Sequence, residues 1–171
     1  MQSLDLQDLR RVQAGEQHAL RALYDRHHGG LYRFLRSDLG REDAEEVLQD
    51  VFMTVWHRAG TFREASTVST WLYGIARNLA RNRQRKHRPT HELLEGDAAY
   101  TPEQVEFLTA LAAVRRLPAR EREVVELVSL GELSLAEAAS VLGIPVGTVK
   151  SRLHAARQRL RAALGGERHG P

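Results

Sequence analysis

Five basic residues between positions 146 and 162 have no acidic residue among them. They are Lys150, Arg152, Arg157, Arg159 and Arg161. Like charges along one helix repel each other and gain little unless an anion lies opposite them. Ammonium and guanidinium groups pair with phosphates, so a nucleic acid is one candidate partner for this stretch, and an ordinary solvated surface is the alternative.

Two further stretches concentrate charge of one sign. Residues 76–90 hold six basic residues and no acid, whereas residues 41–50 hold five acids. The formal net charge of the whole chain is only +3. This uneven distribution indicates contacts with a polyanion at two places and a third surface of another kind.

The sequence shows no motif for catalysis or for binding a metal. It has no cysteine, no glycine-rich phosphate loop with a lysine and no HExxH pattern, and its eight histidines are dispersed. No apolar run is long enough to cross a membrane, and the charged N-terminus is unlike a signal peptide. We therefore expect no enzyme, no metal, no cofactor and no membrane insertion.

The first basic stretch would be presented by a helix, a turn and a second helix. Ser134 followed three residues later by Glu137 is a capping box that starts the first helix. Gly143 ends this helix, and Pro145 suits the first turn of the next one. In the second helix an apolar stripe at spacings of three and four leaves the basic residues outside it. This layout indicates a helix-turn-helix, whose second helix enters the DNA major groove, with an ordinary helical hairpin as the alternative.

Helical periodicity also covers most of the N-terminal half. The expected helices lie at about residues 4–12, 16–39, 41–59 and 70–86. Gly29 and Gly30 interrupt the second of them, and we expect a kink or a weak spot there rather than a break.

The composition changes after the fourth expected helix. Residues 89–103 are rich in proline, glycine and acids and indicate a flexible linker, after which helices resume from Gln104. There is no strand-like alternation. The sequence therefore predicts an all-α fold of two small helical domains joined by this linker. The domains cover residues 5–88 and 104–165, with a tail at 166–171.

Three segments together resemble a known protein family. They are DAEEVLQDVFMTVW from Asp43, STWLYGIARNLARNRQR from Ser69, and LPAREREVVELVSLGELSLAEAASVLGIPVGTVKSRLHAARQRLR from Leu117. In this order and spacing, over roughly residues 8–165, they resemble the extracytoplasmic function (ECF) group of bacterial sigma-70 family sigma factors. The resemblance implies a four-helix sigma-2 domain and a sigma-4 helix-turn-helix domain that together direct core RNA polymerase to promoter DNA.

The resemblance assigns the acidic helix to polymerase binding. In the family, the corresponding helix binds the clamp helices of the polymerase beta-prime subunit, and the beta subunit is a further expected partner. An acidic, partly apolar face suits a basic helical partner, because charge sets the encounter and buried apolar contacts supply the affinity. The apolar candidates are alternatively part of the domain core. The candidates are Asp43, Glu46, Gln49, Asp50, Phe52 and Trp56.

The resemblance assigns the fourth expected helix, with the loop before it, to the melted −10 promoter element. Holding an unstacked base requires a pocket, a polar group for the base edge and cations for the backbone. Asn78 matches the family's polar residue near the flipped base, and Trp71 is alternatively a core residue. The candidates are Trp71, Tyr73, Arg77, Asn78, Arg81, Arg83, Arg85 and Lys86.

The second helix of the helix-turn-helix would lie against the −35 element in duplex form. Lys150 or Arg152 would donate to guanine O6 and N7, the commonest specific contact in the major groove. The remaining candidates would reach base edges or phosphates. The full set is Thr148, Lys150, Ser151, Arg152, His154, Arg157 and Arg159.

Several places depart from the family's usual pattern, among them Arg81 and Asn82, where the family often has an aspartate soon after the Arg-Asn pair. Gly29 and Gly30 replace bulkier residues, Val68 stands where an aromatic residue is common, and Ala155 stands where arginine is frequent. These departures bear on the rigidity of sigma-2, on the −10 preference and on the −35 affinity, respectively.

Two other kinds of protein stay open on the sequence alone. A stand-alone helix-turn-helix regulator would explain the C-terminal half and would bind duplex DNA without polymerase. A structural adaptor would explain the N-terminal helices but not the basic fourth helix. A sigma factor, by contrast, would act in the cytoplasm with core polymerase, and the family commonly adds an anti-sigma factor that covers both domains.

Overall fold

The computed structural model describes residues 2–87 and 100–165, and all regular structure among them is helical. The N-terminal half contains α1 (Gln2–Gln13), α2 (Gln17–Asp38), α3 (Arg41–Arg58), the 3-10 turn η1 (Ala59–Thr61) and α4 (Val68–Lys86). The C-terminal half contains α5 (Pro102–Arg115), α6 (Ala119–Val125), the π-helical turn η2 (Glu126–Leu130), α7 (Leu135–Leu142) and α8 (Val146–Gly165). The expected all-α fold is confirmed.

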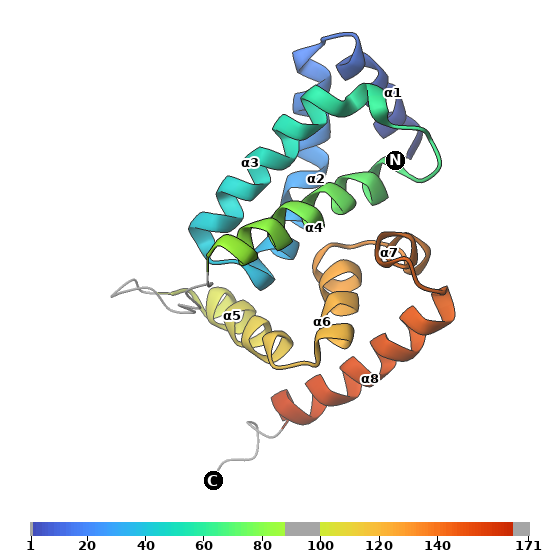
Figure 1. Ribbon diagram of the computed structural model, residues 1–171. Helices are drawn as coiled ribbons and strands as arrows, with labels where there is room; N and C mark the ends of the chain where they lie inside the picture. Colours follow the sequence, from blue (N-terminus) through green and yellow to red (C-terminus); the bar gives the residue numbers. More distant parts are fainter. Residues whose placement is uncertain (1, 88–99, 166–171) are drawn as a thin grey trace.

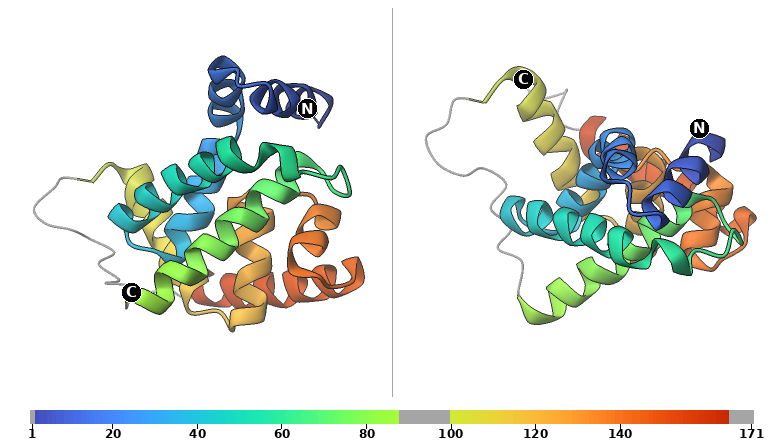
Figure 2. Two further views of the ribbon diagram at one scale, coloured as in Figure 1. Left: turned by 45° about the horizontal axis from the view of Figure 1, so that its top comes forward. Right: turned by 90° about the horizontal axis from the view of Figure 1, so that it is seen from above.

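The two halves lie one against the other, with α4 at the boundary. Figure 1 shows α4 between α3 on one side and α6 and α7 on the other, and the left view of Figure 2 also shows α4 alongside the C-terminal half. Contacts of α4 with α7, and of α2 with η2 and α5, join the halves. The helix predicted to bind the −10 strand is therefore also the helix that faces the other domain.

The backbone of α2 stays helical through Gly29 and Gly30. The glycine pair lies between Leu23 and Leu31, whose side chains are both fully buried in the core. Burial on either side holds the helix in place where glycine alone would weaken it.

Most of the expected linker, residues 88–99, lies outside the described residues. Its C-terminal boundary differs from the prediction, because α5 begins at Pro102 and not at Gln104. Thr101 and Gln104 form a capping box, in which the Thr101 side chain accepts from the Gln104 N–H at 3.3 Å and the Gln104 side chain accepts from the Thr101 N–H at 2.9 Å. This cap, with proline in the first turn, starts the helix earlier.

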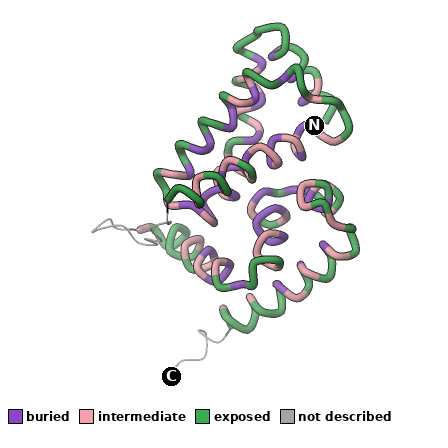
Figure 3. The backbone as a smooth tube through the Cα atoms, in the orientation of Figure 1, coloured by how far each residue is buried: buried purple, intermediate pink, exposed green. Residues whose placement is uncertain are grey.

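Buried side chains of both halves form one continuous apolar cluster. Figure 3 shows the buried residues along the facing sides of the helices, whereas outward turns of α3 and α8 are exposed. Val51 on α3, Leu72 on α4 and Leu127 in η2 are among its buried members. Within residues 2–87 and 100–165, none of the helices combines the length and the apolar character that a membrane span requires.

The helix-turn-helix forms as its local signals predict. The Ser134 hydroxyl accepts from the Glu137 N–H at 3.1 Å, and the Glu137 carboxylate accepts from the Ser134 N–H at 2.9 Å. Gly143 adopts the left-handed conformation, with φ +66°, and ends α7. Buried Ala138 and Ala156 keep the contact between α7 and α8 close. The predicted capping box is confirmed.

Candidate nucleic-acid interface

The helix α8 presents a basic face, free of acids, to solvent. Its apolar stripe, which includes Val149, Leu153 and Ala156, is buried against α6 and α7. The opposite side of the helix carries the exposed candidates Lys150, Ser151, His154 and Arg157. Because the first three lie in the N-terminal half of the helix, this is the side that a helix-turn-helix offers to base edges.

The other −35 candidates lie at the edges of this face. Thr148 and Arg152 are half-buried. The Arg159 Nε lies 2.9 Å from a carboxylate oxygen of Glu121 on α6, so this arginine is paired within its own half of the chain. Ala155, where the family often has arginine, is also half-buried beside the stripe.

The helix α4 carries a shallow pocket on its exposed side. Asn78, Arg81, Asn82, Gln84 and Arg85 line it, and the Arg85 guanidinium donates to the Asn82 side chain. Asn82 and Gln84 are absent from the predicted set. The spacing of four residues from Asn78 to Asn82 on one helix face is the signal that identifies Asn82.

The two aromatic −10 candidates face inward. Tyr73 is 2% exposed, and its hydroxyl donates to the Gly131 carbonyl oxygen at 2.7 Å. Burial raises the pKa of Tyr73 well above its usual range. Trp71 is half-buried and packs on Phe62 of the preceding loop, with ring centroids 5.4 Å apart. In this conformation Tyr73 therefore does not line an open path for a DNA strand, in contrast to the prediction. Val68, at the start of the same helix, is buried as well.

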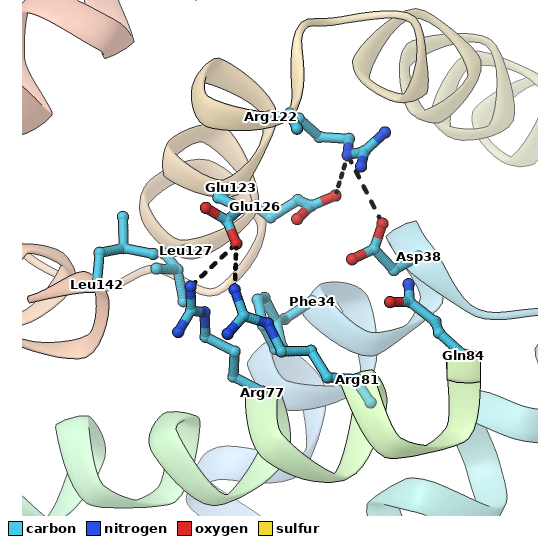
Figure 4. A pocket seen from close by; sticks show the side chains of 12 residues that line it. Phe34, Asp38, Arg77, Arg81, Gln84, Arg122, Glu123, Glu126, Leu127 and Leu142 are labelled. Carbon is cyan, nitrogen blue, oxygen red and sulfur yellow. Dashed lines mark hydrogen bonds and ion pairs between the residues drawn. The ribbon is translucent and has the colours of Figure 1, made fainter. Parts of the chain in front are cut away.

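Three arginines of α4 are paired with carboxylates from other helices. Figure 4 shows the Arg77 and Arg81 side chains pointing at Glu123 of α6, whose Oε1 lies 3.0 Å and 3.2 Å from their Nη2 atoms. Arg83 is paired with two acids of α3, Asp43 at 2.8 Å and Glu46 at 2.7 Å. The hydrogen bond to Glu46 contributes most to a raised pKa of Arg83. Lys86, by contrast, is exposed.

The acidic face of α3 is exposed around one apolar residue. Gln49 and Asp50 are exposed, and Met53 is 55% exposed beside them. Met53 is missing from the predicted polymerase contacts, although its spacing of four and three residues from Gln49 and Asp50 places it on their face.

Two of the predicted polymerase contacts are less accessible. Phe52 is 6% exposed and packs edge-on against Tyr24, with ring centroids 4.9 Å apart. Trp56 is half-buried. The core interpretation of Phe52, which the sequence left open, agrees with this burial.

The parts of the chain that the structure describes contain no group of three or more histidine or acidic side chains arranged to hold a metal ion. Several acidic side chains instead pair with arginines of other helices, as Glu123 does with Arg77 and Arg81. The chemistry that the exposed surfaces offer is therefore recognition of anions by α4 and α8 and recognition of a cationic or apolar partner by α3.

Comparison with known proteins finds two matching family models and several related proteins. The family model described as sigma-70 region 2 matches residues 23–90, and that described as sigma-70, region 4 matches residues 108–160. The ECF RNA polymerase sigma factor SigM of Mycobacterium tuberculosis is 40% identical over 157 residues, which cover 89% of this chain and 80% of SigM. The ECF RNA polymerase sigma factor SigW of Bacillus subtilis is 32% identical over 176 residues, covering 91% of this chain and 94% of SigW.

Two solved structures have a similar fold. CnrH, in complex with the cytosolic domain of CnrY, has a TM-score of 0.78 at 27% identity, covering 95% of this chain and 98% of CnrH. The sigma factor RpoE of Bartonella quintana, in complex with the anti-sigma factor NepR, has a TM-score of 0.61 at 29% identity, covering 79% of this chain and 89% of RpoE. With both sigma-70 regions in order and a relative 40% identical over most of its length, the chain belongs to the ECF group of RNA polymerase sigma factors.

Proposed function

We propose that this sigma factor binds bacterial core RNA polymerase and directs it to promoters through two separate DNA contacts. Residues 5–88 would act as sigma-2, residues 104–165 as sigma-4, and residues 89–103 as the linker between them. The observation that supports the DNA contacts most strongly is the acid-free face of α8, where the exposed Lys150, Ser151 and His154 occupy the base-reading half of a helix-turn-helix.

The −35 duplex would lie along α8. Lys150 would donate to a guanine edge, with Ser151 and His154 beside it, and Arg157 would pair with a phosphate one turn further along. Arg152, half-buried at the edge of the face, would reach the neighbouring strand. Arg159 contributes less, because Glu121 already holds its guanidinium.

The melted −10 strand would follow the exposed side of α4. Asn78 offers an amide to the edge of an unstacked base at the shallow pocket, and Asn82 extends the polar wall. Arg85 and Lys86 would pair with the phosphates that follow, which adds affinity that depends on salt and not on sequence. Arg77 and Arg81 would join them once Glu123 is displaced.

Core polymerase would bind the outer face of α3. Glu46, Gln49 and Asp50 would set the register on the basic clamp helices of beta-prime, and Met53 would supply a central apolar contact. Asp43 also holds Arg83, so the polymerase surface and the basic helix α4 are connected by an ion pair.

The same proposal covers partners and location. The chain would perform no reaction itself, since polymerase carries out the chemistry, and it would work in the cytoplasm. An anti-sigma factor is a further proposed partner, because RpoE was solved with the anti-sigma factor NepR and CnrH with the cytosolic domain of CnrY.

Transcription in vitro tests the proposal. The purified chain, with and without core polymerase, is added to a fragmented genomic library from its host, and transcript starts are mapped. We expect initiation that depends on core polymerase at sites sharing two short motifs at fixed spacing. Tight duplex binding without polymerase and no initiation with it would instead indicate a stand-alone helix-turn-helix regulator.

A further inference from the structure

The two halves of the chain meet at a seam, where α2 and α4 contact α5, η2 and α7. The seam contains a cavity of about 110 Å³. Its lining combines apolar residues, among them the buried Phe34 and Leu127, with charged side chains of α2, α4, α6 and η2. One water molecule takes roughly 30 Å³ in the liquid, so the cavity has room for a small polyatomic ion.

Guanidinium groups reach this cavity from two different helices. Figure 4 shows the Arg122 side chain of α6 on one side and those of Arg77 and Arg81 of α4 on the other. The carboxyl groups of Glu123 and Glu126 lie between them. Arg77 and Arg81 share one oxygen of Glu123, at 3.0 Å and 3.2 Å. A guest in the cavity would therefore meet cations from both halves of the chain.

Two buried polar atoms of the lining have no hydrogen-bond partner among the residues that the structure describes. They are the Arg122 Nε and the Glu126 Oε1. The Arg122 Nε lies 3.6 Å from an oxygen of Glu126 and 3.6 Å from an oxygen of Asp38, which is too long for a hydrogen bond. The Glu126 side chain is 1% exposed and lines the cavity. Because a buried polar atom without a partner is costly, such atoms indicate a bound water molecule or ion.

The lining carries more positive than negative charge at neutral pH. Burial raises the pKa of Glu126 to about 8, so its carboxyl group is protonated and can donate a hydrogen bond. The three guanidinium groups of the lining then face only two carboxylates, those of Asp38 and Glu123. Arg115 of α5 adds a cation nearby, since its charge acts on both Asp38 and Glu126. This excess of positive charge and of hydrogen-bond donors favours an anion over water.

We infer that this cavity binds a phosphate group, either as free phosphate or as part of a small phosphorylated molecule. Arg122 donates to the phosphate from α6, Arg77 and Arg81 donate from α4, and the Glu126 carboxyl group donates from between them. A tetrahedral phosphate presents oxygens in several directions and so suits donors that arrive from two helices, whereas a planar carboxylate presents two oxygens in one plane. The inference concerns a small ligand and does not rest on the proposed promoter function.

Titration calorimetry with inorganic phosphate tests the inference on the full chain. The titration is done at neutral pH, and sodium chloride keeps the ionic strength constant. Binding is measured directly and not through the melting temperature, because phosphate stabilises folded proteins in general by being excluded from their surfaces. We expect a single saturable site on each chain.

Substitutions on α6 and α4 locate the site. Arg122→Gln removes a cation and the unpartnered Nε from the lining, and we expect it to weaken phosphate binding by about ten-fold or more. Its control is Arg120→Gln, which makes the same change at an exposed position of the same helix and should leave binding unchanged. Arg81→Gln removes a cation whose side chain is 52% exposed, so this variant is expected to fold even if Arg122→Gln does not. It should weaken binding several-fold, and helical circular dichroism checks the fold of each variant.

Two further ligands identify the source of the phosphate group. Tighter binding of glycerol phosphate than of inorganic phosphate would indicate a phosphorylated molecule, and the reverse would indicate free phosphate. Acetate is expected to bind about ten-fold more weakly than either, and equal binding of acetate would contradict the assignment to phosphate.

Two other results would overturn the inference. One is the absence of saturable phosphate binding, which would mean that the unpartnered groups bind only water. The other is phosphate binding that Arg81→Gln and a folded Arg122→Gln leave unchanged, or that Arg120→Gln weakens equally. These measurements need neither DNA nor polymerase, so failure of the phosphate site is distinct from failure of the proposed promoter function.

Discussion

The basic helices α4 and α8 are alike in sequence and differ in their neighbours. Each carries a run of cations without an acid. On α8, Lys150 and Arg157 are exposed on an open face. On α4, Arg77 and Arg81 are paired with Glu123, and Arg83 with acids of α3. A basic run shows what a helix can bind, and the helices packed around it decide whether that surface is free.

The difference has a consequence for the order of binding. If both helices bind DNA as proposed, the α8 face would meet the duplex without rearrangement, whereas Arg77 and Arg81 of α4 would become available only after Glu123 of the other half moves away. Partly exposed ion pairs stabilise a folded protein by only about 0–1 kcal/mol each. Phosphates can therefore replace the Glu123 carboxylate once the apolar contact between the two halves has opened. We therefore expect substitutions at the contact between the two halves to change single-strand binding by α4 and to leave duplex binding by α8 unchanged.

The largest expected effect comes from pH. Glu126, 1% exposed at the seam, has a pKa raised to about 8 from the ordinary 4.5, first by burial and then by Asp38 of α2. Arg122 lies 3.6 Å from each of these two carboxylates, and Glu123 and Arg115 also contribute to the charge around Glu126. The closed, folded chain thus holds a proton that an unfolded chain releases at lower pH. The stability contributed by this group is complete below about pH 4.5 and is lost as the pH rises through about 8.

Glu126→Gln tests the direction of this pH dependence, because glutamine has nearly the same shape as glutamate and stays neutral at every pH. The stability of the natural chain is expected to fall by an amount on the order of several kcal/mol across that pH range, and that of the variant to stay flatter. Urea midpoints at a series of pH values measure both, with Glu106→Gln as the exposed control. Parallel pH profiles for the natural chain and Glu126→Gln would show that this carboxyl does not control the seam.

The second prediction concerns the open helix. Replacing Lys150 and Arg157 together with alanine removes two cations from the α8 face, and we expect −35 duplex affinity to fall by about ten-fold or more. The slope of log affinity against log salt should decrease in steepness by about 1.8. Fluorescence anisotropy over a salt series measures both quantities. The control for net charge replaces Arg21 and Arg41, two exposed arginines of the other half, with alanine. An equal loss of −35 duplex affinity in this control would mean that net charge matters and the position of the cations does not.

How far the sequence predicts this molecule depends on the range of the interaction. Ser134, Glu137 and Gly143 determine the ends of α7 through contacts a few residues long, and their roles are readable from spacing alone. The partner of Arg77 is Glu123, which lies 46 positions away, and no local pattern indicates it. The close packing around Gly30 is equally hidden from the sequence, because it depends on Tyr73 and Gly131, which lie far along the chain.

The same limit explains which surface residues were missed. Met53 sits within a run of apolar residues whose other members are mostly core, and only the packing of α3 shows which of them points outward. Tyr73 reads equally well as a base-stacking ring or as a buried one, because both uses place it on the same helix. Only its contact with Gly131, from the other half of the chain, distinguishes the two in this conformation.

The third prediction separates a structural arginine from a DNA-binding one on α4. Arg83→Gln removes the cation shared by Asp43 and Glu46. Because the pairs are partly exposed, we expect a loss of about 1 kcal/mol or less in the free energy of unfolding and little change in single-strand affinity. Arg85→Gln, which changes an exposed arginine at the shallow pocket, should show the reverse pattern. Urea unfolding and oligonucleotide binding of the two variants decide the matter, and a larger loss of DNA affinity in Arg83→Gln would place this residue on the DNA path.

The smallest expected effect lies within α8 itself. Arg159 is 60% exposed, yet its guanidinium is held 2.9 Å from Glu121, whereas Arg157 stands on the open face. The ion pair with Glu121 should keep Arg159 from binding DNA although it is exposed. Arg159→Ala should therefore change −35 duplex affinity by less than about two-fold, whereas Arg157→Ala should lower that affinity several-fold. Glu121→Gln removes the partner of Arg159 and frees its guanidinium. In that background, the same titration should show a larger loss of −35 duplex affinity on Arg159→Ala than in the natural chain. If Arg159→Ala and Arg157→Ala lose equal affinity in both backgrounds, intramolecular pairing does not govern which cations of this helix reach DNA.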